Sequence, residues 1–145
     1  MKIRKSIVAA GAAVVLSGTG ALVLPAVASA HSTTHTLKFT AVTNKSINFS
    51  KTNFGNQETD VNSTGKTIGF DDVNFTITGP NTGKGRVALD IKGGFLYGAI
   101  ATTNGGKTFT GKVTGGTGPY AGATGTITAK GITRNKTAVT IIYNS

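Results

Sequence analysis

The sequence predicts an all-β domain, a closed antiparallel barrel of about eight strands, and three observations lead to this prediction. Apolar and polar residues alternate with a period of two along most of the chain, and after residue 30 no segment keeps the spacing of an amphipathic helix. Turn sequences rich in Gly and Asn separate the alternating runs. Several runs are apolar on both faces and prolines are few, which favours a sheet that closes on itself and has no open edge.

Seven runs of the sequence have the strand pattern, and with the turns between them they predict seven or eight short strands. Within one run, the apolar positions shift by one residue across Asp71 and Asp72, which predicts a β-bulge there. Abundant Thr suits the pleated surface of a sheet because it is β-branched. The seven runs are residues 34–43, 66–78, 85–92, 95–103, 107–114, 124–132 and 137–144.

The N-terminus has the pattern of a cleaved, bacterial-type secretory signal peptide. Three basic residues precede an apolar run at 7–24, and Ala-Ser-Ala at 28–30 provides the small residues that precede a cleavage site. We therefore expect a secreted, extracellular protein with no membrane segment after cleavage. The predicted divisions are a signal peptide at 1–30, a flexible leader at 31–35 and the barrel domain at 36–145.

The charge and cysteine content narrow the function classes. The chain has 15 Lys and Arg against 5 Asp and Glu, and three of the basic residues belong to the predicted signal peptide. The others are scattered singly, and only Arg86 and Arg134 are arginines, whereas a nucleic-acid surface clusters basic residues and adds stacking aromatics. We expect no nucleic-acid partner. The absence of cysteine excludes disulfides, so packing alone must stabilise the domain.

Histidines offer little catalytic or metal-binding chemistry. Cleavage after Ala30 would make His31 the mature N-terminus, whose amine and imidazole could chelate copper, but the second His35 lies on the same short leader. We expect no metal site and no cofactor. A Ser-His-Asp triad is excluded because the predicted barrel contains no histidine.

Acidic residues are the candidate catalytic groups. Glu58 and Asp60 are two residues apart, so on a strand they share one face; they either enter the barrel together as an acid–base pair or face the solvent near the following turn. Asp71 and Asp72 face opposite sides, and Asp90 alternates with apolar residues and should point outward. If the protein is an enzyme, Glu58 and Asp60 are the predicted catalytic residues.

The segment "TGGTGPYAGATGTIT" at 114–128 resembles the pattern G-G-T/A-G-x-[FY]-x-G-A-x-G that allene oxide cyclases and plant dirigent proteins share. The resemblance extends over roughly residues 36–143. It implies an eight-stranded barrel with a cup-like apolar cavity, commonly assembled as a homotrimer. In this pattern Tyr120 would plug the barrel and the glycines would shape a tight corner: Gly115, Gly116, Gly118, Gly122 and Gly125.

The resemblance and the apolar strands together predict a barrel that binds a small apolar or aromatic molecule in its cavity. Two alternatives remain open at the level of sequence. One is an isomerase or cyclase that holds a reactive substrate in one productive shape, which requires few acid–base groups. The other is a structural cell-surface or matrix protein. The residues expected to line the cavity are Asp72, Asn74, Phe95 and Tyr97.

Overall fold

The computed structural model describes residues 32–145. The predicted signal peptide, its cleavage site and His31 lie outside the described residues. Within the described range no helix has the length and hydropathy that a membrane crossing requires.

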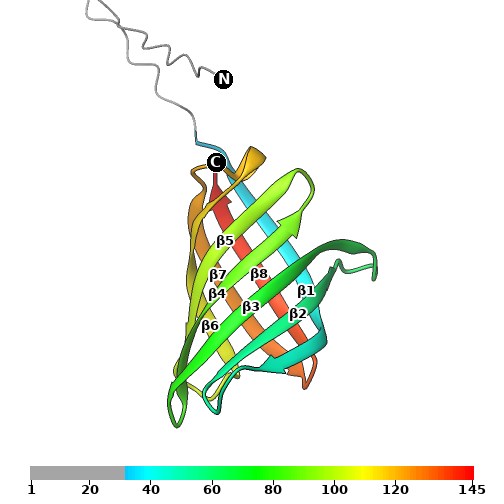
Figure 1. Cartoon of the computed structure of the whole chain (residues 1–145). Helices are drawn as coiled ribbons and strands as arrows, with labels where there is room; N and C mark the ends of the chain where they lie inside the picture. Colours follow the sequence, from blue (N-terminus) through cyan, green and yellow to red (C-terminus); the bar gives the residue numbers. More distant parts are fainter. Residues whose placement is uncertain (1–31) are drawn as a thin grey trace, which may run out of the picture. The chain divides into compact units, whose positions relative to one another are not determined.

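The described residues form eight strands and one short 3-10 turn. Each strand pairs antiparallel with the next, and the last strand pairs with the first, so the sheet closes into a barrel (Figure 1). The prediction of a closed antiparallel barrel is confirmed. The elements are β1 (Thr34–Asn48), β2 (Asn53–Val61), β3 (Thr67–Gly79), β4 (Thr82–Ile91), β5 (Gly94–Thr102), β6 (Thr108–Gly116), η1 (Gly118–Tyr120), β7 (Thr124–Thr133) and β8 (Lys136–Asn144).

Residues of the predicted flexible leader belong to the barrel. β1 begins at Thr34, which pairs with Asn144, and His35 pairs with Tyr143. The rings of His35 and Tyr143 are stacked with their centroids 5.0 Å apart. The two ends of the described chain therefore lie side by side at one end of the barrel (Figure 1).

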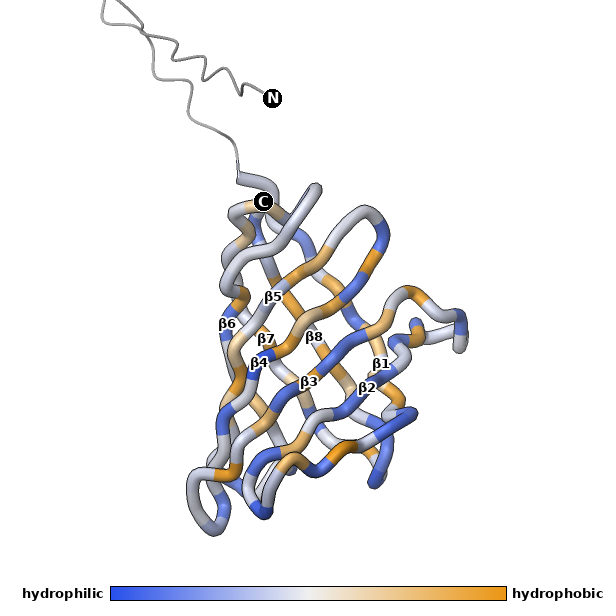
Figure 2. The backbone as a smooth tube through the Cα atoms, in the orientation of Figure 1, coloured by the Kyte–Doolittle hydropathy of each residue, from blue (hydrophilic) through white to orange (hydrophobic). Residues whose placement is uncertain are grey.

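The strand β3 continues without interruption through the position where a bulge was predicted. Its pairing with β4 is regular from Gly69 to Ile77, so the predicted bulge at Asp71 and Asp72 is wrong. The apolar pattern shifts because an acidic residue, Asp71, occupies an inward position while Phe70 is 57% exposed on the outer face. Apolar and polar residues alternate along most strands of the barrel, as the changing colours of the tube show (Figure 2).

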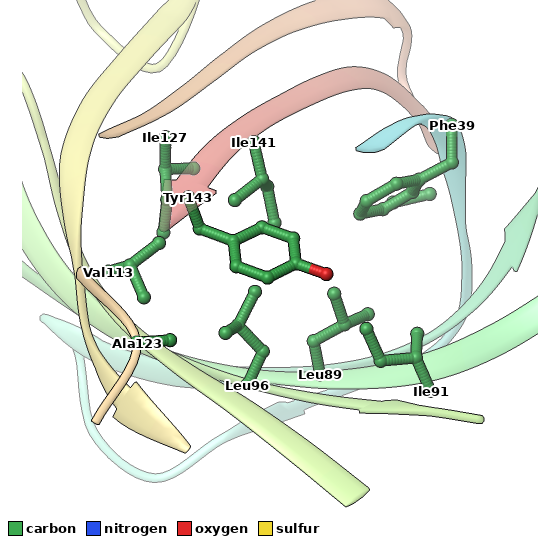
Figure 3. Close-up of a cluster of buried hydrophobic side chains, with 10 residues drawn as sticks. Phe39, Leu89, Ile91, Leu96, Val113, Ala123, Ile127, Ile141 and Tyr143 are labelled. Atoms are coloured by element: carbon green, nitrogen blue, oxygen red, sulfur yellow. The ribbon is translucent and has the colours of Figure 1, made fainter. Parts of the chain in front are cut away.

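The apolar core fills the end of the barrel near the chain termini. Tyr143 points inward from β8 among side chains of several other strands, including Leu89 of β4 and Leu96 of β5 (Figure 3). Tyr120 packs edge-on against Tyr143, with ring centroids 5.8 Å apart, and its hydroxyl donates a hydrogen bond to the Lys92 carbonyl oxygen at 3.1 Å. This end is therefore closed by packed side chains, and Tyr120 contributes to the closure.

The glycine corner joins β6 to β7 through η1 and uses glycine for two physical reasons. Gly115, Gly118 and Gly122 have positive φ, a conformation that other residues rarely adopt. At Gly116 and Gly125 a Cβ atom would collide with the carbonyl oxygens of Phe95 and Ile142. The structure thus explains the five glycines by local architecture.

Candidate functional site

The inner faces of β2 and β3 carry the acidic residues of the barrel interior. Glu58 and Asp60 on β2 and Asp71 on β3 are buried, with exposed fractions of 8%, 0% and 7%. Three of the five acidic residues of the chain are therefore inside the barrel. Acidic residues are rarely buried unless they are paired, so this placement requires an explanation.

The sheet register brings these three residues together. Glu58 lies directly opposite Asp71 in the β2–β3 ladder, which places their Cβ atoms about 5 Å apart. Asp60 lies opposite Gly69. Gly69 and Asp71 are successive inward positions on β3, so Asp60 is the diagonal neighbour of Asp71. Because Gly69 has no side chain, it leaves the space beside Asp60: a Cβ there would be 3.5 Å from Asp60 Oδ2. We call Glu58, Asp60 and Asp71 the carboxyl cluster.

The members of the cluster differ in their hydrogen bonds. The Thr43 hydroxyl on β1 donates to Glu58 Oε1 at 2.7 Å, and the Asn56 amide donates to the same oxygen at 3.4 Å. Both carboxyl oxygens of Asp60 and Oδ1 of Asp71 are buried and accept no hydrogen bond from the described residues. Glu58 thus has the donors that stabilise a carboxylate, and the two aspartates lack them.

Burial and proximity raise the pKa of both aspartates and keep Asp71 protonated at neutral pH. Burial, together with the charges of Asp60 and Glu58, raises the pKa of Asp71 to about 9. Burial also raises the pKa of Asp60 to about 7, and the charge of Glu58 contributes in the same direction. A hydrogen bond between two carboxyl groups requires a proton on one of them, and Asp71 supplies this proton at neutral pH. The cluster therefore combines a proton donor, Asp71, with a carboxylate acceptor, Glu58.

A cavity of about 100 Å³ lies inside the barrel next to the cluster. Glu58 and Asp71 line it, together with aliphatic side chains such as Val87 and Leu89 and four phenylalanine rings. An apolar cavity of about 150 Å³ is known to hold benzene. This cavity therefore has room for a few heavy atoms, and a larger guest requires side chains to move.

Three of the four phenylalanine rings that line the cavity form a group of neighbouring rings: Phe54, Phe75 and Phe109. The ring of Phe75 is tilted against Phe54 with centroids 5.4 Å apart and meets Phe109 edge-on at 5.6 Å. Phe75 is buried and lies over Gly83, where a Cβ would collide with its ring, whereas Phe54 and Phe109 are only half-buried. These rings lie toward the end of the barrel opposite η1, and Phe75 is the fixed member of the group.

The residues predicted to line the cavity lie on the outer face. Asp72 and Asn74 on β3 are exposed, and Phe95 and Tyr97 on β5 are 40% and 38% exposed. The residues adjacent to them in the sequence point inward instead: Asp71, Val73 and Leu96. β5 is apolar on both faces, so its sequence could not distinguish the two faces. Asp72, Asn74 and Tyr97 instead line an external groove of about 810 Å³ together with Arg86 and Phe49.

Sequence reasoning did not single out Asp71, Thr43 or the aromatic rings as parts of the site. The signal for Asp71 was present, because the interrupted alternation at residues 70–73 marks an acid at an inward position. Thr43 had no such signal, since its role depends on the β1–β2 register. Asp90 is exposed, as its alternation indicated. Among residues 32–145, no group of three His, Cys, Asp or Glu side chains has the spacing to hold a metal ion.

Comparison with known proteins relates the chain to other barrels through structure. No protein-family model and no curated protein sequence matches it. A pyocyanin demethylase superposes with a TM-score of 0.61 at 20% identity, over 75% of this chain and 99% of that chain.

Two further solved structures are similar over most of the chain. The Diels-Alderase AbmU from Streptomyces koyangensis has a TM-score of 0.60 at 14% identity, over 76% of this chain and 63% of that chain. A pterocarpan synthase dirigent protein has a TM-score of 0.67 at 14% identity, over 91% of this chain and 98% of that chain. The chain therefore shares the fold of these structures, among them a dirigent protein, as its glycine corner indicated.

Proposed function

We propose that this protein is a secreted barrel that binds a small apolar or aromatic molecule in its internal cavity. The observation that carries the proposal is the cavity itself, which is apolar over most of its surface and has a few polar groups, among them the carboxyl groups of Glu58 and Asp71. Sites for small molecules combine an apolar lining with a few placed polar groups. The printed descriptions of similar barrels, a demethylase, cyclases and a dirigent protein, name activities on small organic molecules.

A substitution that fills the cavity tests this proposal. Ala129 lines the cavity, and Ala129→Leu would occupy the space that the guest requires. Ala101→Leu, on the exposed face of β5, is the matched control. Purified protein is incubated with an extract of the culture in which it is secreted, and the retained molecules are identified by mass spectrometry. We expect a molecule retained by the wild type and by Ala101→Leu but not by Ala129→Leu; equal retention by all three would overturn the proposal.

A second candidate function is that of an isomerase or cyclase, and the carboxyl cluster favours it. A protonated Asp71 next to the Glu58 carboxylate can donate one proton and accept another at neutral pH, which is the requirement for general acid–base catalysis. The test is to search the same extract for a molecule that is converted to a product of equal mass. Asp71→Asn should abolish the conversion, whereas Asp72→Asn on the outer face should leave it unchanged. Binding without conversion would support the binding function alone.

A further inference from the structure

The barrel interior has acidic groups but no basic group to balance them. Every lysine and arginine among residues 32–145 is exposed, and so are His35, Asp72 and Asp90. The carboxyl cluster therefore faces no opposing charge from any of the strands that surround it. Tyr143 is the only other buried titratable side chain in the described part of the chain, and it carries no positive charge. Buried carboxyl groups of folded proteins are ordinarily paired with a cation or with hydrogen-bond donors.

The two aspartates of the cluster have no hydrogen-bond donor from outside the cluster. Asp60 is completely buried, and no other side chain donates to either of its oxygens or to Oδ1 of Asp71. The proton of Asp71 can make only one hydrogen bond, to Asp60 or to Glu58. Asp71 also lines the cavity, so a guest can reach it directly. Thr43 and Asn56 donate only to Glu58. Asp60 does not line the cavity, so the carboxyl group to which a guest can bring a donor is that of Asp71.

The remainder of the cavity matches an apolar chain with a cationic end. Phe54, Phe75 and Phe109 present aromatic rings, whose faces attract cations, and the other lining side chains are largely aliphatic. The volume of about 100 Å³ accommodates a short chain rather than a fused ring system. The spacing of the acids does not suit a metal ion, as described above, whereas an ammonium group has three N–H donors and no fixed coordination geometry.

We infer that the carboxyl cluster binds the amino group of a small apolar amine. This inference rests on the proposed binding function and specifies its ligand class. The amine enters as the free base, and the proton of the Asp71 carboxyl group moves to the amine nitrogen. The O–H bond of Asp71 breaks, an N–H bond forms, and an ammonium–carboxylate pair results. Because the amine is mainly protonated in water at pH 7, the overall process releases about one proton to the solvent for each amine bound.

Entry as the free base also fits the charge of the barrel surface. With three acids buried, only Asp72 and Asp90 offset the exposed lysines and arginines. This positive surface disfavours the approach of a cation, although salt screens the effect beyond about 8 Å at physiological ionic strength. A neutral amine crosses the surface without this penalty and acquires its charge next to the carboxyl cluster.

A pair of probes of nearly equal size tests the inference on the wild-type protein. Butylamine and butan-1-ol have the same number of heavy atoms, and only the amine can become a cation. Binding is followed by NMR of ¹⁵N-labelled protein at pH 7, and released protons are measured with an indicator dye in weakly buffered solution. At pH 7 only a small fraction of butylamine is free base, so the affinity of the free base is calculated from the pKa of the amine and compared with that of butan-1-ol. We expect the free base to bind about tenfold more tightly, the difference of one charge-assisted hydrogen bond, and to release about one proton per amine.

Variants then assign the effect to the cluster. Asp71→Asn should reduce binding of the butylamine free base to the level of butan-1-ol and abolish proton release, whereas Asp72→Asn, the neighbouring acid on the outer face, should preserve both. Circular dichroism checks that each variant is folded. If a variant does not fold, the comparison of butylamine with butan-1-ol on the wild-type protein still tests the inference. If butan-1-ol binds and the free base of butylamine binds no more tightly, the inference is overturned while the proposed function stands. If neither probe perturbs the cavity amides, both are overturned.

Discussion

Glu58 and Asp71 face each other directly across the β2–β3 ladder inside the barrel, both buried, and only Glu58 accepts hydrogen bonds from neighbouring side chains. This difference separates two chemically similar groups into a stabilised carboxylate and a protonated acid. Asp60, behind them, is completely buried and increases the difference through its own charge. The pair therefore determines both how the barrel responds to pH and what it can do to a guest.

The stability of the protein should decrease as pH rises above about 4. In the unfolded chain an aspartate has a pKa near 3.8, whereas in the folded protein burial raises the pKa of Asp71 to about 9 and that of Asp60 to about 7. Between these values the folded state holds protons that the unfolded state has lost, so each group lowers the free energy of unfolding by about 1.4 kcal/mol per pH unit. Thermal unfolding should therefore show a higher Tm at pH 5 than at pH 8.

Asp71→Asn provides the check on this pH dependence. Between pH 7 and 9 Asp71 is the group that still loses its proton, so the variant should remove most of the decrease in stability in this range. Below pH 7 it should remove part of the decrease in stability. Asp72→Asn is the matched control because Asp72 is exposed on the same strand. A wild-type Tm that rises from pH 5 to pH 8 would contradict the assignment of protonated aspartates to the interior.

Thr43→Val should destabilise the protein. Valine has the shape of threonine but lacks the hydroxyl, so Glu58 loses its donor at 2.7 Å and keeps only Asn56 at 3.4 Å. Loss of a donor to a buried carboxylate costs about 1–3 kcal/mol. Chemical denaturation at pH 7 measures this change. Thr110→Val, on the exposed face of β6, should be nearly neutral, and an equal effect of the two substitutions would contradict a specific role for the Thr43 hydroxyl.

Gly83→Ala should displace the ring of Phe75. The added Cβ would collide with that ring, and Phe75 also contacts Phe54 and Phe109, so the change propagates to all three aromatic rings. We expect a loss of stability of about 1–3 kcal/mol, as for other overpacked cores, together with an altered near-ultraviolet circular dichroism spectrum. At Gly131 the nearest atom to an added Cβ is 3.8 Å away. Gly131→Ala is therefore the control, and it should keep the stability and the near-ultraviolet circular dichroism spectrum of the wild type.

The outer face of β5 should take part in assembly. Phe95 and Tyr97 are stacked with ring centroids 6.2 Å apart and an interplanar angle of 9°, although both are substantially exposed. Exposed aromatic groups of this kind mark interaction surfaces. We expect light scattering to give the mass of a homotrimer, and Phe95→Ser with Tyr97→Ser to shift it toward the monomer. Ile132→Ser, at an exposed apolar residue of β7, should have no effect; a monomeric wild type would exclude the assembly.

The sequence predicted the barrel because its strands keep a regular alternation and its corner has a distinctive arrangement of glycines. Prediction was poorest where the interior is polar. β2 places Asn56, Glu58 and Asp60 on its inner face, so it lacks the apolar pattern by which the other strands were recognised. The same cause produced the mistaken bulge in β3, where Asp71 takes an inward position between apolar residues.

The orientation of the doubly apolar strands was the other part that the sequence could not provide. On β5, Leu96 points inward and Phe95 and Tyr97 point outward, and either arrangement would bury apolar side chains. Only the register with the neighbouring strands determines which set enters the barrel. Glu58 could be proposed from its residue type, but its partnership with Asp71 required the pairing of β2 with β3.

The grouping of Phe54, Phe75 and Phe109 has a consequence for kinetics. The cavity is small and its opposite end is packed with side chains of the core, so we expect a guest of more than a few heavy atoms to enter and leave by displacing aromatic rings. Phe75 is held over Gly83, and the half-buried Phe54 and Phe109 are the rings with freedom to turn. Association is then slower than the diffusional encounter, since each entry awaits a transient opening. Once the rings close again, the same motion limits escape, and a weakly bound guest acquires a long residence time.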